Sequence, residues 1–249
     1  MLVKTEGIII RTRDYGEGNK IITIFSSQVG KVSVMARGAK KPKSRLSSIS
    51  QLFTYGQFLF HRSSPNSMGS LSQGEIIESF RDLRQDLTKT AYAAYFAELV
   101  DKIVDDGEIN IYVFQLLLTV FKYLDDGIDA EILARLVEMK MLTIGGYKPE
   151  VNQCVSCGGV ENINSFSIRE GGFLCEQCRE EDSYRIILLP STIKLLRLFY
   201  HYEIERMGSV SVKRETREEL KKILWLFMDH HTPLRLKSRS FIEQMSTFL

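Results

Sequence analysis

Apolar and polar positions alternate in short runs over the first eighty residues, which is the pattern of β-strands. The runs are rich in Val, Ile, Phe and Thr, and turn-forming stretches at 16–19 and 28–30 separate the first three. The five predicted strands are Val3 to Thr12, Lys20 to Phe25, Lys31 to Ala36, Gln51 to Phe60 and Leu71 to Glu78. Five strands in so short a stretch, with no helical period among them, favour a small closed barrel of the OB type over a two-sheet sandwich.

From residue 81 the apolar positions recur every three or four residues, which indicates amphipathic helices. Asp-Gly pairs at 106–107 and 126–127 separate three predicted helices, and Gly145-Gly146 ends the third. Three more are predicted at Pro190 to about Met207, Lys213 to His230 and Ser238 to Leu249. We therefore predict an α+β multidomain protein with a barrel at 1–80, a helical domain in two parts at 81–150 and 183–249, and an insert at 151–182.

All four cysteines lie in the insert, as the CxxC pairs Cys154/Cys157 and Cys175/Cys178. Two residues between paired thiols let both sulfurs face one tetrahedral centre, and an intervening span of this length is common in zinc sites. Disulfides or a thioredoxin-like redox pair fit less well, because no secretory signal is recognisable and the pairs lie in glycine-rich loops. We predict a zinc ribbon with one Zn²⁺, whose four thiolate ligands leave no position for an activated water and give it a structural role.

The net charge of +2 conceals an uneven distribution. Residues 1–80 carry eleven Lys/Arg and five Asp/Glu, whereas residues 81–249 carry twenty-two and twenty-six, so the first part is +6 and the remainder is −4. This asymmetry indicates a surface for a polyanion on the barrel. The densest cluster runs from Arg37 to Arg45, with five cations and no acid, in a predicted loop between two strands. OB-type proteins grip phosphates with such loops, although a merely solvated loop is the alternative interpretation.

The candidate nucleic-acid-binding residues are the five cations of this loop and four on the strands around it. They are Arg11, Arg13, Lys20, Lys31, Arg37, Lys40, Lys41, Lys43 and Arg45. Phe53, Tyr55, Phe58 and Phe60 are candidate stacking platforms for bases, but strand alternation favours a core role for most of them.

No motif of a common catalytic site is present. There is no GxxxxGK[ST] loop, no GxGxxG at a strand–helix junction, no GxSxG and no HExxH. The Asp229-His230-His231 sequence ends a predicted helix, where His complements the helix dipole, and the acids between Asp82 and Glu108 suit helix caps better than a two-metal nuclease. We therefore predict that the protein is not an enzyme. No apolar run is long enough to span a bilayer, so we expect a cytoplasmic protein without a membrane partner.

Several of these segments, taken together and in order, resemble the bacterial RecO family of recombination mediators. They are Gly7 to Arg11 with Tyr15 to Glu17, Gly30-Lys31, Ala36 to Ser44, Gly146 to Pro149, both CxxC pairs, Phe166-Ser167, Gly171-Gly172 and Leu236 to Ser238. The match covers almost the whole chain and shows no large departure. It implies an N-terminal OB-fold, a helical domain and an embedded zinc ribbon.

For function, the resemblance implies binding of single- and double-stranded DNA and annealing of complementary strands coated with single-strand-binding protein. It also implies action with RecR, and often RecF, in loading RecA onto gapped DNA at the nucleoid. The helical domain would hold the C-terminal tail of single-strand-binding protein, with Lys194 and Arg197 as its predicted rim. An RNA-binding or transcription-associated protein with an OB module and a zinc ribbon is the main alternative, and a metal-dependent nuclease and a structural scaffold are two others.

Overall fold

The computed structural model describes residues 1–65, 67–204 and 211–248, apart from the side chains beyond residue 245. These residues form two compact units, one of residues 1–128 with 236–249 and the other of residues 129–235. None of the helices in the described ranges combines the length and the apolar character needed to cross a lipid bilayer. The four-part division at residues 80, 150 and 182 stays a prediction.

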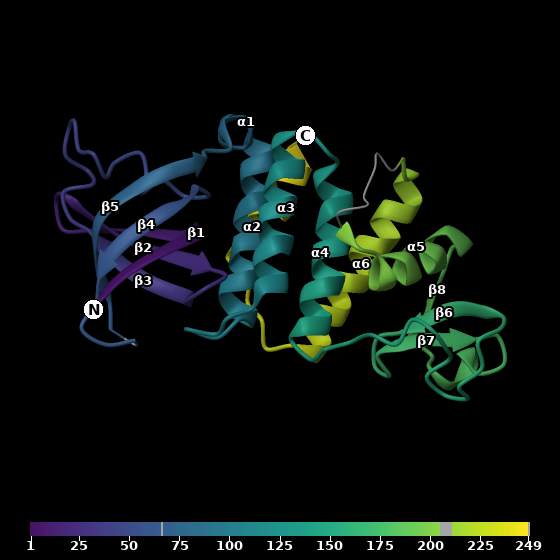
Figure 1. Ribbon diagram of the computed structural model, residues 1–249. Coiled ribbons are helices and arrows are strands. Elements are labelled where there is room, and N and C mark those ends of the chain that lie inside the picture. Colours follow the sequence, from purple (N-terminus) through teal and green to yellow (C-terminus); the bar gives the residue numbers. More distant parts are fainter. Residues whose placement is uncertain (66, 205–210, 249) are drawn as a thin grey trace. The chain divides into compact units, whose positions relative to one another are not determined.

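The first unit begins with five strands that close into a barrel in the order β1-β2-β3-β5-β4 (Figure 1). They are β1 Leu2–Tyr15, β2 Asn19–Ser26, β3 Gly30–Ala36, β4 Tyr55–His61 and β5 Gly69–Glu78. Neighbouring strands are antiparallel except β3 and β5, which pair in parallel only through Val34 with Gly69 and Met35 with Ser70. Inward-facing side chains such as Ile24, Phe58 and Phe60 are fully buried. The predicted OB-type barrel is confirmed.

The connection between β3 and β4, residues 37–54, folds as consecutive turns that pack on the barrel core. Ile49 is buried there because Gly74 has no side chain, since a Cβ on Gly74 would lie 2.6 Å from Ile49 Cγ1. The prediction that a strand begins at Gln51 is wrong. Phe53 adopts a φ of 67°, which breaks the extended conformation, and its ring packs edge to face against Phe121 with 5.3 Å between centroids.

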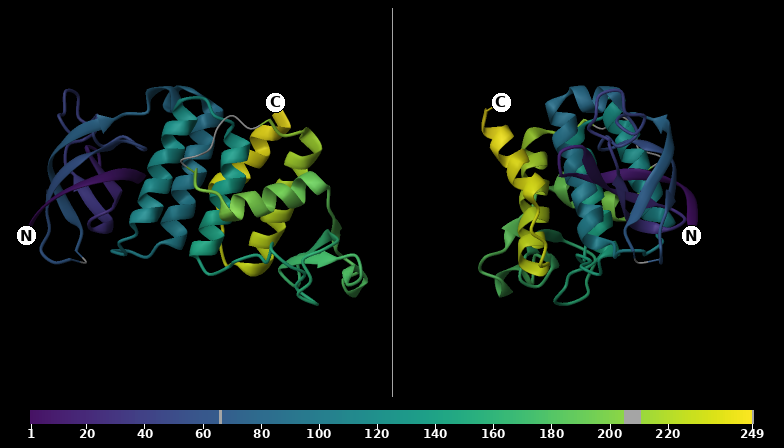
Figure 2. Two further views of the ribbon diagram at one scale, coloured as in Figure 1. Left: turned by 45° about the vertical axis from the view of Figure 1, so that its right-hand side comes forward. Right: turned by 90° about the vertical axis from the view of Figure 1, so that its left-hand side faces the viewer.

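Four helices complete the first unit: α1 Arg81–Gln85, α2 Leu87–Ile103, α3 Ile111–Asp125 and α7 Lys237–Phe248. Asp86 caps α2 by accepting a hydrogen bond from the N–H of Lys89, as expected for an acid at a helix start. The last helix, α7, is drawn in yellow in Figure 2 and packs on α2. Its first N–H groups, those of Lys237 and Ser238, donate to the carboxylate of Glu98 on α2. This carboxylate satisfies donors that a helix start leaves without a partner.

In its described residues, the second unit contains one helix, then three short strands with a short 3-10 helix among them, and then two further helices. They are α4 Ala130–Ile144, β6 Ile163–Ser167, β7 Gly172–Cys175, η1 Arg179–Glu181, β8 Ile186–Ile187, α5 Pro190–His201 and α6 Arg214–His231. Lys140 of α4 donates to the carbonyl of Tyr200 on α5, and Trp225 of α6 donates to Glu138 of α4 at 2.8 Å. Helical structure therefore continues on both sides of the insert, as predicted.

The extent predicted for the helix after the ribbon is wrong. It ends at His201 rather than near Met207, because Tyr202 is extended, with a φ of −79° and a ψ of 137°. Residues 205–210, which the prediction also included, lie outside the described ranges.

Candidate metal centre and nucleic-acid interface

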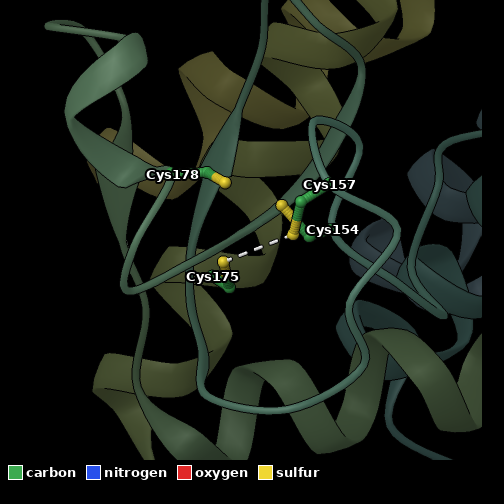
Figure 3. A group of neighbouring side chains, drawn as sticks. All are labelled: Cys154, Cys157, Cys175 and Cys178. Atoms are coloured by element: carbon green, nitrogen blue, oxygen red, sulfur yellow. Dashed lines mark hydrogen bonds between the residues drawn. The ribbon is translucent and has the colours of Figure 1, made fainter.

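The four cysteines converge on one point of the ribbon (Figure 3). Their sulfur atoms all lie within 4.8 Å of one another, and the Sγ atoms of Cys157 and Cys175 are 3.8 Å apart. A disulfide needs a bond of about 2.05 Å, and all four thiols are free. Tetrahedral zinc with Zn–S bonds of about 2.3 Å separates its sulfurs by about 3.8 Å. The arrangement therefore fits a four-thiolate metal site.

Backbone N–H groups surround these sulfurs. Burial opposes ionisation of Cys154, but hydrogen bonds from the backbone of Cys157, Cys175 and Ser156 outweigh it and lower the pKa of this thiol to about 6. For Cys178 a hydrogen bond from Ser156 favours the thiolate, yet burial and the three neighbouring thiols raise the pKa to about 12. The thiolate form is thus favoured at Cys154 and opposed at Cys178, and a bound cation would favour it at Cys178 as well.

The ribbon has little apolar core around the sulfurs, although Phe166 and Phe173 are buried where it packs on Phe227 of α6. Its buried cluster consists of Leu174 with Cys154, Cys175 and Cys178, and only a few partly buried side chains pack against it. The sheet above it has three short strands in the order β7-β6-β8. Since so small a cluster contributes little by itself, a metal ion held by the four thiolates would add most of the stabilisation at this end of the ribbon.

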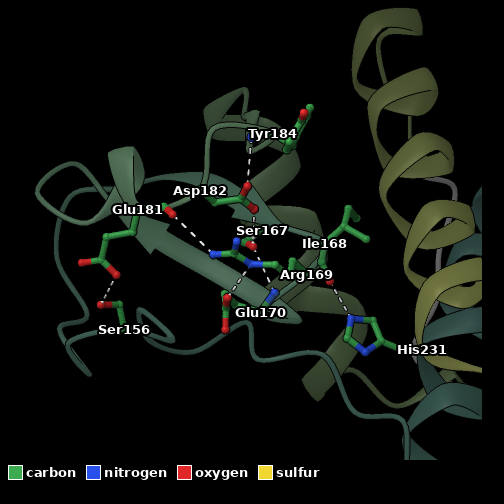
Figure 4. Close-up of polar contacts among 9 residues, drawn as sticks. All are labelled: Ser156, Ser167, Ile168, Arg169, Glu170, Glu181, Asp182, Tyr184 and His231. Atoms are coloured by element: carbon green, nitrogen blue, oxygen red, sulfur yellow. Dashed lines mark hydrogen bonds and ion pairs between the residues drawn. The ribbon is translucent and has the colours of Figure 1, made fainter.

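Figure 4 shows polar contacts within the ribbon and one contact that joins it to α6. Asp182 is buried and accepts hydrogen bonds from Ser167 Oγ at 2.5 Å and from the N–H of Tyr184 at 2.9 Å. The bond from Ser167 lowers the pKa of this carboxyl despite its burial. At the end of α6, Nε2 of His231 lies 2.5 Å from the carbonyl oxygen of Ile168. His231 therefore has a structural contact, in line with the non-catalytic interpretation of the His pair.

The two residues predicted to bind a partner peptide differ in their surroundings on α5. Lys194 is exposed. Arg197 donates to the carbonyls of Val151 at 3.0 Å and Asn152 at 3.4 Å, and its guanidinium lies 5.6 Å from the ring centre of Phe173. Arg197 thus fixes the segment that leads into the ribbon, and the peptide site stays a prediction.

The basic segment, residues 37–45, is anchored to the hairpin between β1 and β2. The N–H of Lys40 donates to Gly18 O at 3.0 Å, and the N–H of Gly38 donates to Asn19 Oδ1 at 2.8 Å. Lys40 also pairs with Asp14 at 2.6 Å, and this hydrogen bond lowers the pKa of Asp14. The segment is therefore held against the barrel by its backbone.

The other four cations of the basic segment are exposed and, within the described part of the chain, form no ion pair. They are Arg37, Lys41, Lys43 and Arg45. Arg13 is also exposed on β1, and Lys20 lies opposite Asp14 in the β1–β2 pairing. The structure thus brings the hairpin cations and the basic segment to the same end of the barrel, where they form a surface suited to phosphates.

Arg11 and Lys31 face acidic side chains instead. Lys31 is buried, and its ammonium donates to Asp101 O at 2.7 Å and pairs with the carboxylates of Asp101 at 3.4 Å and Asp106 at 3.2 Å. Arg11 pairs with Asp101 at 2.9 Å. These cations attach the barrel to α2 and the loop after it, so a phosphate would have to compete with two carboxylates. Their role in DNA binding stays a prediction.

The aromatic residues considered as stacking platforms are mostly buried. Phe53, Phe58 and Phe60 are buried, and the hydroxyl of Tyr55 donates to Glu6 at 2.7 Å. Burial and this hydrogen bond raise the pKa of Tyr55 to about 12. The core role favoured by strand alternation is confirmed, and the idea of stacking platforms is wrong for the three Phe residues.

The sequence interpretation missed a groove of about 640 Å³ on the barrel. Lys4, Arg45, Gln57, Gln73 and Glu75 line it together with apolar and backbone groups. Strand alternation places Lys4 and Gln57 opposite core positions, but it places Gln73 and Glu75 on the same face as buried Leu71, and only the bulge in the β4–β5 pairing turns them outward. Their pairing across strands could not be read without the register.

Comparison with known proteins gives one family over nearly the whole chain. The family model for the recombination protein O N terminal matches residues 1–80, and that for the recombination protein O C terminal matches residues 84–240. A DNA repair protein RecO of Halalkalibacterium halodurans is 46% identical over 247 residues, which covers 99% of this chain and 96% of the relative. Proteins of the same name from Bacillus velezensis and Bacillus subtilis are 49% and 48% identical with the same coverage. The chain therefore belongs to the RecO family.

Proposed function

We propose that the protein acts in recombinational DNA repair as a non-enzymatic mediator. It binds single- and double-stranded DNA, anneals complementary strands coated with single-strand-binding protein, and acts with RecR and RecF to help load RecA. Family membership supports the repair role, and the basic segment on the OB-type barrel is the observation that carries the DNA-binding part. DNA repair takes place on the chromosome, so we place the protein at the nucleoid in the cytoplasm.

The barrel would hold a strand by its phosphates. Arg37, Lys41, Lys43 and Arg45 extend from a segment whose backbone is already fixed to the hairpin, so binding costs little ordering of the chain. Arg13, Lys20 and Lys40 border the same surface. Such contacts are largely indifferent to base sequence, which suits a protein that must anneal any pair of complementary strands.

The ribbon residues Cys154, Cys157, Cys175 and Cys178 would hold one structural Zn²⁺, which supplies coordination bonds and no reactive position. The ribbon in turn fixes α5 and α6 through Arg197 and His231. We place the tail of single-strand-binding protein on the helical part of the chain, where exposed Lys194 offers a charge for its acidic residues.

The test is annealing of two complementary oligonucleotides coated with single-strand-binding protein, followed by fluorescence without ATP. The charge-removed variant replaces Lys40, Lys41, Lys43 and Arg45 with Gln. A matched control replaces three Lys and one Arg elsewhere: Lys102, Lys122, Lys222 and Arg235, also with Gln. We expect annealing by the wild type and the control and loss of annealing in the charge-removed variant. Absence of annealing by the wild type would refute the mediator function, whereas equal loss in both variants would refute the assignment of the basic segment.

The salt dependence of DNA affinity is a second measure of the phosphate contacts made by the basic segment. If the five cations of the basic segment each neutralise one phosphate of a single strand, log affinity falls against log salt with a slope of about −3.5. The charge-removed variant, which lacks four of them, should show a slope shallower by about 2.8. A slope unchanged by the substitutions would mean that the phosphates bind elsewhere on the protein.

A further inference from the structure

The groove found on the barrel is built from neighbouring positions of three paired strands. Lys4 of β1 lies opposite Leu59 of β4, and Leu59 lies opposite Gln73 of β5. Two residues along these strands, Gln57 pairs with Glu75. Side chains directly opposite one another, and those two residues apart, share one face of a sheet. The groove therefore has an apolar floor at Leu59 with two amides, a carboxylate and an ammonium around it.

Within the described residues, the polar side chains of this groove have no ion-pair or hydrogen-bond partner in the protein. Lys4 and Arg45 form no ion pair there, and the side chains of Gln57 and Gln73 make no hydrogen bond to the protein. A polar groove whose donors and acceptors are all available is suited to a ligand that combines an anion with hydrogen-bonding edges. At about 640 Å³, the groove is also in the usual size range of ligand sites.

The groove is continuous with the basic segment. Arg45 is the last cation of that segment and also lines the groove, beside Leu46. A strand whose phosphates follow residues 37–45 would thus reach the groove at Arg45. Beyond Ser70, β5 pairs with β4 alone, because the pairing of β3 with β5 covers only Gly69 and Ser70. Beyond Ser70, this edge of β5 is therefore not paired with another strand.

We propose that this groove binds one unstacked nucleotide of a single strand. The phosphate lies between Lys4 and Arg45, the ring lies over Leu59, and the base edge meets Gln57, Gln73 and Glu75. The inference rests on the proposed DNA-binding function and adds to it a preference for single-stranded over duplex DNA. A base inside a duplex cannot turn its edge into the groove, so the groove contributes to single-strand binding and not to duplex binding.

The carboxylate of Glu75 adds a base preference. Carboxylates accept hydrogen bonds from the exocyclic amino group of cytosine, whereas thymine has no such donor. The groove should therefore favour cytosine over thymine by about fivefold at one position.

The experiment measures fluorescence anisotropy of labelled oligo-dC, oligo-dT and a duplex of equal length with the full-length protein. Gln57→Ala with Gln73→Ala should weaken single-strand binding about tenfold, the loss expected for two hydrogen bonds, and leave duplex binding unchanged. Glu75→Gln should remove most of the preference for oligo-dC. The matched control is Gln85→Ala with Gln115→Ala, two exposed amides of the same unit outside the groove, which should change neither affinity. Thermal unfolding of each variant checks the fold.

The outcomes distinguish failure of the proposed DNA-binding function from failure of the nucleotide site alone. If the wild type binds none of the three DNAs, the proposed function and the nucleotide site both fail. If the wild type binds DNA but the groove variants keep their single-strand affinity, or lose single-strand and duplex affinity equally, only the nucleotide site is overturned. In that case the open edge of β5 makes an extended peptide the occupant to test next.

Discussion

The barrel and the ribbon are both small β-structures, but different forces hold them together. The barrel buries a cluster of aliphatic and aromatic side chains, among them Ile24, Phe58 and Phe60. Around its cysteines the ribbon buries only Leu174, while Phe166 and Phe173 are buried where the ribbon meets Phe227 of α6. The comparison teaches that the barrel is stabilised by packing, whereas the cysteine end of the ribbon has few apolar contacts and an arrangement of thiols that fits a metal ion. Changes in one region should therefore leave the other intact.

The largest effect is expected from loss of the metal. Structural zinc contributes on the order of 10 kcal/mol to small domains, so Cys154→Ser with Cys157→Ser should unfold the ribbon. Zinc content should fall to zero and amide protection should be lost in β6 and β7, while the barrel strands keep theirs in hydrogen exchange. Gln177→Ser, which lies between two ligands and leaves all four sulfurs, is the matched control. Retained protection in the ribbon of the double variant would show that packing suffices there.

A smaller effect is expected from a cavity in the barrel. Phe58 is completely buried, and replacing a buried Phe with Ala costs about 3–5 kcal/mol. Phe58→Ala should lower the free energy of unfolding of the barrel by this amount in urea denaturation, with zinc content unchanged. Phe241→Ala is the control, because Phe241 is 45% exposed and loss of its ring leaves no comparable cavity. Loss of zinc from Phe58→Ala would contradict the independence of the two regions.

The smallest effect concerns the exposed pair that joins the basic segment to the barrel. The hydrogen bond from Lys40 lowers the pKa of Asp14, so the pair stabilises the fold above the ordinary Asp pKa of about 3.9. That contribution is lost as pH falls through the lowered pKa of the folded protein. Carboxyl NMR titration should show the pKa of Asp14 rising toward its ordinary value in Lys40→Gln. An unchanged pKa would mean that the pair does not persist in solution, as is common for exposed ion pairs.

Local patterns predicted much of the fold. All five strands were recognised from alternation, and the CxxC spacing indicated the metal centre, because both signals depend on neighbours in sequence. Phe53 shows where this fails: it continues the alternating pattern toward Tyr55, but its positive φ comes from packing against Phe121. A contact made with a distant helix leaves no trace in the local pattern.

The candidate DNA site also depends on contacts between residues that are distant in sequence, which local patterns cannot predict. The sequence does not distinguish Lys31 from Lys41, since both are lysines of a basic region. In the structure, Lys31 is buried against Asp101 and Asp106, whereas Lys41 is exposed. The groove residue Lys4 was not among the candidate residues, because Leu59 and Gln73, which lie beside it on the sheet, are more than fifty positions away in the sequence. Composition predicted that the barrel is basic, but only the strand register shows which cations are available.

The contact of Glu98 with the start of α7 has a consequence for biosynthesis. The second unit is continuous in sequence, whereas the first is completed only by α7, which packs on α2. During translation, residues 129–235 leave the ribosome before α7 exists, so the second unit can fold while the first still lacks a helix. Until then, the N–H groups of Lys237 and Ser238 have not reached Glu98, and the part of α2 that α7 will cover stays open to solvent or to a chaperone.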